Sequence, residues 1–280
     1  MMKTGVLVGL HDIRANLERV KSYGFGFAQI CSWDINSFTP ALAEEVKSAI
    51  ADTGVAVRTF WCGWPGPASW TFYDGPLTLG LVPDAYRFER TQALLKGIEF
   101  AHQCGIKQVA THAGFIPEDM NDPKYPATLI ALKTLVRQCK HYDMNFLFET
   151  GQETPVTLLR CFETVGTDNL GINLDTANVI LYGKANPADA LDVFGKYVRN
   201  LHAKDGFYPT NGHDLGTEAR IGDGKVDFRA VFTKLHELGY DRYVTIEREI
   251  EGAQQIEDVR YSKTYLEKII TEIYGEDALC

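Results

Sequence analysis

The chain has 280 residues and a formal net charge of −9, from 28 basic and 37 acidic residues. With 45% hydrophobic and 23% charged residues, it has the composition of a folded globular protein, which excludes disordered, fibrous and coiled-coil chains. The acidic excess argues against non-specific nucleic-acid binding, which needs a basic surface. No apolar run approaches the roughly 18 residues of a membrane span. Because the first apolar run also meets charge too early for a signal peptide, we expect a cytoplasmic protein.

The cysteines are scattered without the C-x-x-C spacing of metal or redox motifs. In a chain of this size without an export signal, we expect them to be reduced thiols that lie mostly in the core. They are Cys31, Cys62, Cys104, Cys139, Cys161 and Cys280.

Short apolar runs alternate with amphipathic stretches along the whole chain, and each pair predicts a strand followed by a helix. The first strand is expected at residues 6–10, before a helix capped by Asp12. The later pairs are predicted at 25–33 with a helix from about 39, 55–61 with 85–104, 108–112 with 126–142, 145–149 with 156–165, 170–175 with 187–196, 198–202 with 228–238, and 243–247 with 256–274. Gly54, Gly105 and Gly239 follow predicted helices, where a left-handed cap is needed.

Eight such units in 280 residues average 35 residues each, which suits a strand, a helix and two loops. The alternation predicts a parallel sheet covered by helices. Eight units favour a single, closed, eight-stranded (β/α)8 TIM barrel spanning residues 1–280 over an open doubly wound sheet. No linker divides the chain, and no G-x-G-x-x-G follows the first strand, so nothing indicates a dinucleotide-binding half.

Four successive predicted strands end in residues that can bind a metal: Glu149, Asp175, His202 and Glu247. Reactive groups of such barrels lie at the carboxyl ends of the strands. Taken alone, each acidic residue fits a helix cap or a solvated loop, and the histidine fits a core position. Together, three carboxylates and one imidazole predict one divalent cation, such as Mn²⁺, Mg²⁺ or Co²⁺, with Zn²⁺ also possible.

The motifs around these residues resemble those of the xylose isomerase-like barrel superfamily, which includes sugar isomerases, ketose 3-epimerases, inosose dehydratases and endonuclease IV. The His-x-Lys-Asp element followed by Gly-x-Gly-x-Val-Asp is similar to the branch usually labelled sugar phosphate isomerase/epimerase. The motifs are FETGQE at 148–153, NLDT at 173–176, LHAKD at 201–205, GDGKVDF at 222–228 and TIERE at 245–249.

The resemblance implies that these four residues bind one divalent ion, with Mn²⁺ expected first, and that Glu149 and Glu247 also exchange a proton next to a substrate carbonyl. It implies an isomerase or epimerase that acts on a small sugar or polyol ketone and assembles as a homodimer or tetramer. One alternative is a lyase or dehydratase that eliminates a group from keto-sugars or inososes. Another is a catalytically idle barrel that serves as a binding subunit. The acidic charge argues against the endonuclease branch.

Seven further residues are candidate substrate contacts: His112, Lys204, Asn178, Trp61, Trp33, Glu153 and Arg220. Each also has a purely structural interpretation, such as a packed side chain, a salt bridge or a loop charge. Asn178 stands where many members of the superfamily have a histidine, and Arg220 lies further along the loop than the arginine of the epimerases. The Gly-rich stretch 220–225 is predicted to form a turn before a helix capped by Asp227, rather than a phosphate cradle.

Overall fold

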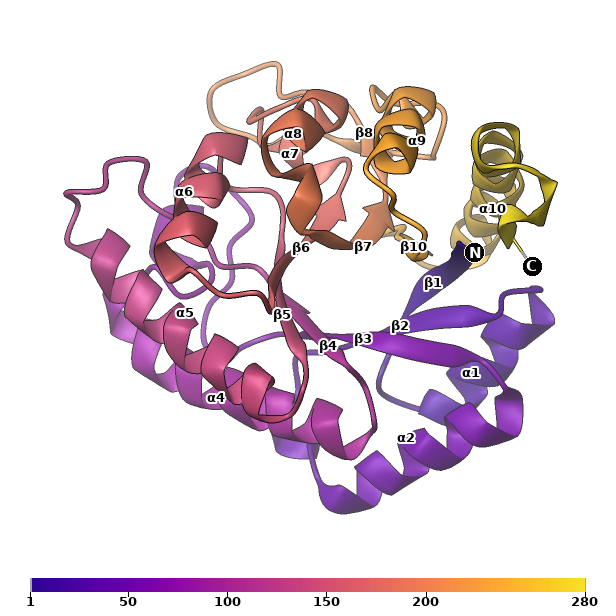
Figure 1. Ribbon diagram of the computed structural model, residues 1–280, viewed down its shortest axis with the longest axis horizontal. Helices are drawn as coiled ribbons and strands as arrows, with labels where there is room; N and C mark the ends of the chain where they lie inside the picture. Colours follow the sequence, from indigo (N-terminus) through magenta and orange to yellow (C-terminus); the bar gives the residue numbers. More distant parts are fainter. Residues whose placement is uncertain (1, 280) are drawn as a thin grey trace.

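Eight parallel strands close into a barrel in the computed structural model, which describes residues 2–279 (Figure 1). Around the barrel the strands follow the order β1, β10, β7, β6, β5, β4, β3 and β2, and β2 pairs with β1. The bounds are β1 Lys3–Gly9, β2 Phe27–Ser32, β3 Ala56–Cys62, β4 Gln108–Thr111, β5 Asn145–Glu149, β6 Leu170–Asp175, β7 Val198–Ala203 and β10 Tyr243–Ile246. The predicted TIM barrel is confirmed.

The helices lie outside the strands, and the ends of the chain lie close together beside β1 and α10 (Figure 1). A two-stranded ribbon, β8 Asp205–Gly206 with β9 Glu218–Ala219, follows β7. The α-helices are α1 Ile13–Ser22, α2 Pro40–Thr53, α3 Gly75–Thr78, α4 Asp84–Gln103, α5 Lys124–His141, α6 Pro155–Val165, α7 Asn178–Leu181, α8 Pro187–Phe194, α9 Phe228–Glu237 and α10 Ala253–Tyr274. Short 3-10 turns occupy Ile35–Ser37, Gly195–Tyr197 and Glu276–Leu279.

Local chemistry explains where several helices begin and end. The Thr39 hydroxyl accepts the N–H of Leu42 before a proline at the first position of α2, and the Asp227 carboxylate caps α9. Gly54, Gly105 and Gly239 all have positive φ, which confirms the predicted left-handed caps. The predicted cap at Asp12 is wrong. Its backbone is itself left-handed, with φ of 48°, and its side chain accepts no N–H of the helix.

Several predicted boundaries differ from the structure by a few residues. Strand β1 begins at Lys3, where its register with Tyr243 of β10 starts, and β2 begins only at Phe27. Phe25 instead closes the end of α1, because its N–H donates to the carbonyl of Val20. Helix α5 begins at Lys124, since a proline is tolerated in the first turn.

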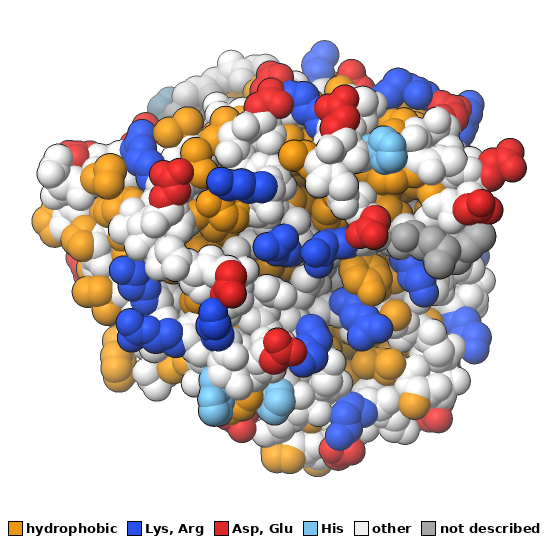
Figure 2. Space-filling model, viewed as in Figure 1, with side chains coloured by type: hydrophobic (Ala, Val, Ile, Leu, Met, Phe, Trp, Pro, Cys, Tyr) orange, Lys and Arg blue, Asp and Glu red, His pale blue; other side chains and the backbone are white. Residues whose placement is uncertain are grey.

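The core lies between the outer faces of the strands and the apolar faces of the helices. The cysteines among residues 2–279 are free thiols, and all except the half-buried Cys31 are buried; Cys280 lies outside the described residues. Within residues 2–279, no helix combines the length and the apolar character that crossing a membrane requires. Figure 2 shows basic, acidic and hydrophobic side chains interspersed over one face of the molecule.

Candidate metal and substrate site

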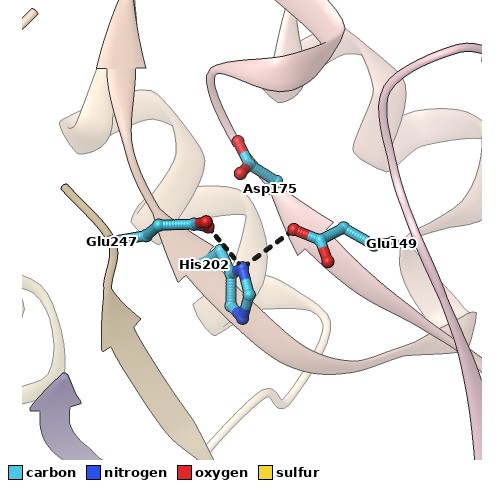
Figure 3. A group of neighbouring side chains, drawn as sticks. All are labelled: Glu149, Asp175, His202 and Glu247. Atoms are coloured by element: carbon cyan, nitrogen blue, oxygen red, sulfur yellow. Dashed lines mark ion pairs between the residues drawn. The ribbon is translucent and has the colours of Figure 1, made fainter. Parts of the chain in front are cut away.

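Four side chains meet at the carboxyl edge of the barrel: Glu149, Asp175, His202 and Glu247 (Figure 3). Each can offer one ligand atom, and these atoms all lie within 4.8 Å of one another. Glu149 and Asp175 are the last residues of β5 and β6, His202 lies in β7, and Glu247 directly follows β10. Parallel strands bring successive residues that are 26, 27 and 45 positions apart in sequence to one edge, as the sequence predicted.

The imidazole of His202 stands between two carboxylates. Its Nδ1 lies 3.0 Å from Oε1 of Glu149 and 2.7 Å from Oε2 of Glu247. In Figure 3 these two carboxylates approach the ring from opposite sides. Burial alone would lower the pKa of His202, but the two carboxylates raise it well above its usual range. Burial would raise the pKa of both glutamates, but nearby positive charge lowers it, from His202 and His112 for Glu149 and from Lys204 and His202 for Glu247.

Asp175 presents one oxygen to the cluster and uses the other to fix its own position. Oδ1 accepts the backbone N–H groups of Ala177 and Asn178, both at 2.8 Å, where the chain turns into α7. Oδ2 is buried without a hydrogen-bond partner. Burial, together with the negative charge of the neighbouring glutamates, raises the pKa of Asp175 well above its usual range. A buried, unpartnered carboxylate oxygen beside two further carboxylates and an imidazole fits a divalent cation.

A belt of amide side chains lies beneath the cluster inside the barrel. The side-chain amide of Asn200 donates to the side-chain oxygens of Asn173, at 2.6 Å, and of Gln29, at 2.7 Å. Asn173 and Asn200 precede Asp175 and His202 by two residues, so they share the inward face of their strands. The belt ties β2, β6 and β7 together below the ligand atoms, which supports their placement.

Lys204 is buried beside the cluster, as the alternation along the strand predicted. Its Nζ lies 3.9 Å from a carboxylate oxygen of Asp175, 3.9 Å from one of Glu247 and 2.9 Å from Oε2 of Glu249. The side-chain oxygen of Asn178 lies 3.4 Å away. Burial would lower the pKa of Lys204, but the surrounding carboxylates raise it well above its usual range. Lys204 is therefore a buried ammonium group at the edge of the site.

Glu149 and Glu247 of the cluster line a cavity of about 650 Å³ that opens at the barrel mouth and whose lining continues onto α1 and α10. Ligand sites of proteins usually fall in this range of volume. The lining includes the predicted contacts His112, Asn178, Lys204, Trp33 and Trp61. His112 immediately follows β4, and its Nε2 lies 3.9 Å from Oε2 of Glu149.

Indole rings form one wall of this cavity. The ring of Trp33 lies 5.0 Å from that of Trp61, and the ring of Trp70 lies 5.1 Å from the imidazole of His112. The indole N–H of Trp61 donates to the carboxylate of Glu149. The aromatic wall therefore contacts one of the candidate metal ligands directly.

Two predicted substrate contacts lie elsewhere. Glu153 is buried and does not line the cavity, and burial raises the pKa of its carboxyl to about 8. Arg220 does not line the cavity either. It pairs with Asp223 at 3.0 Å, and its guanidinium carbon lies 4.1 Å from the centre of the Tyr261 ring. Both structural interpretations hold, and substrate contact is not supported for either residue.

The Gly-rich stretch is a turn organised by an internal carboxylate. Asp205 accepts the backbone N–H groups of Gly222, Gly224 and Val226 at 2.9–3.0 Å. A Cβ at Gly224 would lie 2.1 Å from that carboxylate, so glycine is required there. The predicted structural turn is confirmed, and its N–H groups are already occupied.

Three residues of the site were not predicted from the sequence: Glu249, Tyr182 and Gln29. Glu249 follows Glu247 by two residues in an extended segment, so alternation could have indicated it. Tyr182 and Gln29 reach the site through the barrel closure and the turn of α7, and no local pattern marks them.

A closed parallel barrel with an acidic cluster and one histidine at its carboxyl edge defines a class of barrels able to hold a metal at that position. The sequence profile of one such family, the xylose isomerase-like TIM barrel, matches residues 17–269, and the chain belongs to this family. The crystal structure of a xylose isomerase domain protein from Planctomyces limnophilus has a TM-score of 0.91 and 28% identity over 98% of this chain and 99% of that one.

Two further proteins are similar to this chain. An inosose dehydratase of Lacticaseibacillus casei is 23% identical over 202 residues, which is 60% of this chain and 66% of that protein. A structure titled D-tagatose 3-epimerase-like protein has a TM-score of 0.75 and 20% identity over 98% of this chain and 99% of that one, which shows the shared fold. The chain spans just under two thirds of the length of the curated relatives it matches, 64–66%.

Proposed function

We propose that the protein is a divalent-cation-dependent isomerase or epimerase that moves a proton next to the carbonyl of a sugar or polyol ketone. The arrangement of Glu149 and Glu247 carries this proposal. They come from separated strands, β5 and β10, are buried, and approach His202 from opposite sides (Figure 3). Because both line the same cavity, one carboxylate can remove a proton from a bound substrate and the other can return a proton to it.

Glu149, Asp175, His202 and Glu247 would hold the cation. When bound, a divalent cation stabilises negative charge that develops on the carbonyl oxygen during proton removal. Three carboxylates and one imidazole favour Mn²⁺, and Mg²⁺ and Co²⁺ suit the same donors, whereas Zn²⁺ usually takes more nitrogen or sulfur. The orphaned oxygen of Asp175 and the amide belt support a cluster preformed for the ion.

The charges around the cavity favour a substrate without a phosphate group. Lys204 is paired with Glu249, and Arg248 is held at 3.1 Å by Glu218 and at 2.8 Å by Asp258. The backbone N–H groups of the Gly-rich turn donate to Asp205. At the charged end of the cavity, a phosphate would have to displace one of these internal carboxylates. Hydroxyl groups need no such exchange, and the indole wall suits the C–H face of a polyol ring.

The metal requirement is tested directly on the purified protein. Elemental analysis should find a divalent metal, and after chelation Mn²⁺ should raise the melting temperature, because an ion that binds only the folded state stabilises it. Asp175→Asn should remove most of this stabilisation, whereas Asp192→Asn, on the surface of α8, should leave it unchanged. Absence of both bound metal and Mn²⁺-dependent stabilisation would contradict the proposed reaction.

A second candidate, β-elimination from a keto-sugar or inosose, is favoured by Lys204. Its buried ammonium lies 3.9 Å from Glu247, so it can donate a proton to a departing hydroxyl while a glutamate takes the proton next to the carbonyl. One C–H and one C–O bond then break, a C=C bond forms, and water leaves. The inosose dehydratase relative supports this alternative.

Reactions in D₂O separate the two candidates. D-tagatose, D-fructose and scyllo-inosose are suitable probes, followed by NMR and mass spectrometry. Deuterium incorporated next to the carbonyl of a sugar that keeps its oxygen atoms supports epimerisation or isomerisation. A product that has lost the elements of water supports elimination.

We further propose that the chain forms a homodimer or tetramer. Three large apolar side chains are strongly exposed, namely Tyr73 at 85% and Leu77 at 60% on the segment between β3 and α4, and Phe88 at 78% in the first turns of α4. Exposed apolar groups of this kind are typical of protein contacts. Light scattering coupled to size-exclusion chromatography measures the mass in solution, and a monomer at micromolar concentration would refute this part of the proposal.

A further inference from the structure

The segment between β3 and α4, residues 63–83, is a long connection that contributes to the lining of the cavity. It carries Trp70, whose ring lies 5.1 Å from the imidazole of His112 and 6.4 Å from the ring of Trp33. Trp70 lines the cavity and is 40% exposed. The position of this segment therefore sets the indole wall opposite the charged cluster.

Arg90, on α4, joins the two arms of this segment. Its Nη1 donates to the carbonyls of Thr78 and Gly80, both at 2.7 Å. Its Nη2 donates to the carbonyl of Pro67 at 2.8 Å, and its Nε donates to that of Pro65 at 3.1 Å. One guanidinium thus holds residues 65–67 of the descending arm against residues 78–80 of the returning arm.

The guanidinium of Arg90 is fully buried and has no carboxylate within ion-pair distance among residues 2–279. Two aromatic rings cover it, with the centre of Trp64 at 5.4 Å and that of Tyr86 at 4.6 Å. A buried charge without a counter-ion is costly. What Arg90 supplies in return is a planar fork that reaches four carbonyls at once, which a lysine cannot do.

Both ends of the segment are seated closely on the barrel mouth. A Cβ at Gly63 would lie 2.5 Å from the ring of Trp33, and a Cβ at Gly80 would lie 2.1 Å from the carbonyl oxygen of Ala113, the residue after His112. The N–H of Leu81 donates to the same carbonyl at 2.7 Å. Since both ends are fixed, the clamp at Arg90 decides how far the intervening residues, including Trp70, extend over the cavity.

We propose that Arg90 is a positioning residue for substrate binding: by clamping residues 65–67 to residues 78–80, it holds Trp70 against His112 as a wall for the polyol. This role rests on the proposed function. Arg90 touches neither the cavity nor the charged cluster, so its effect on catalysis passes through Trp70.

The test is a double-mutant cycle on Arg90→Lys and Trp70→Ala, with the probe from D-tagatose, D-fructose and scyllo-inosose that the enzyme turns over. Each single variant should raise KM about tenfold and change kcat less than threefold, because the indole wall binds substrate without joining the proton transfer. In the double variant the two increases in KM should not multiply, because both substitutions remove the same contact between Trp70 and the substrate. Arg87→Lys is the control. Arg87 donates to the carbonyls of Leu81 and Val82 and pairs with Asp84, but makes no hydrogen bond to residues 65–67, so this variant should leave KM unchanged.

A second measurement needs no substrate. Hydrogen exchange of residues 65–80 should accelerate in Arg90→Lys and not in Arg87→Lys. Acrylamide should also quench the fluorescence of Trp70 more strongly in Arg90→Lys than in wild type. The Trp70 signal is identified as the fluorescence that is lost in Trp70→Phe. Unchanged exchange and quenching overturn the clamp. The role of Arg90 in binding is overturned if the KM increases of the two single variants multiply in the double variant. It is also overturned if KM is unchanged in a well-folded Trp70→Ala protein. If no probe reacts while exchange and quenching change as expected, the proposed function fails and the clamp stands.

Discussion

The two halves of the barrel present different chemistry at the same edge. Strands β5, β6, β7 and β10 bring Glu149, Asp175, His202 and Glu247 to within 4.8 Å of one another. Strands β2 and β3 lead instead to Trp33 and Trp61, and the segment after β3 adds Trp70. The comparison indicates a division of labour. The later strands supply charge for proton transfer, and the earlier ones supply an apolar wall that binds and orients the substrate.

The strongest challenge to this division is removal of one carboxylate from the charged half. Glu149→Gln and Glu247→Gln should each lower kcat by about 10³-fold or more, because an amide cannot accept the proton that the reaction moves. Steady-state kinetics with the active probe measures the effect. Glu44→Gln, an exposed residue of α2, is the matched control and should behave as wild type. Activity within tenfold of wild type in either site variant would refute the two-carboxylate mechanism.

The charged half could be predicted from sequence because each ligand type ends a strand, and strand ends of a barrel share one edge. Lys204 could be predicted because alternate residues share a face. The wall was only partly predictable. Trp33 and Trp61 end predicted strands, whereas the place of Trp70 depends on how Arg90 folds a long connection, and no local pattern encodes that.

Three predictions depended on loop conformation. Glu153 is buried, Arg220 pairs with Asp223, and neither lines the cavity. Asp12 precedes a helix, as a cap would, but its left-handed backbone directs the carboxylate away from the first N–H groups. In each case the loop conformation determines where the side chain lies, and the residue type alone does not predict that conformation.

A substitution of Lys204 tests whether its ammonium group takes part in the chemistry of the charged half. Lys204→Met keeps most of the buried length but removes the ammonium, so we expect about a 10²-fold loss of kcat if the ammonium donates a proton or holds a developing negative charge. Lys47→Met, at an exposed pair on α2, controls for loss of a surface lysine. In D₂O the variant should lose elimination more than proton exchange. If Lys204→Met has the same kcat as wild type, Lys204 is only a structural counter-ion.

A smaller effect is expected from the apolar half. Trp33→Ala removes a half-exposed indole that packs on Trp61, and KM should rise about fivefold to tenfold while kcat changes little. Trp33→Phe should restore much of the affinity because it keeps an aromatic face. Initial-rate kinetics across a substrate range separates the two constants. A fall in kcat without a rise in KM would break the proposed division, because the wall would then act in the chemical step.

The smallest expected effect concerns Glu153, a carboxyl in the charged half that faces neither the cavity nor the cluster. Burial raises its pKa from 4.5 to about 8, so the folded protein holds the proton over a range in which the unfolded chain has released it. Glu153 therefore costs stability progressively as the pH rises from about 4.5 to about 8. Glu153→Gln removes this titration, and its melting temperature should gain about 7 °C on wild type between pH 5 and pH 8. Glu163→Gln, at an exposed position on α6, should show no such gain, and a constant difference for Glu153→Gln across this range would mean that the carboxyl is ionised when folded.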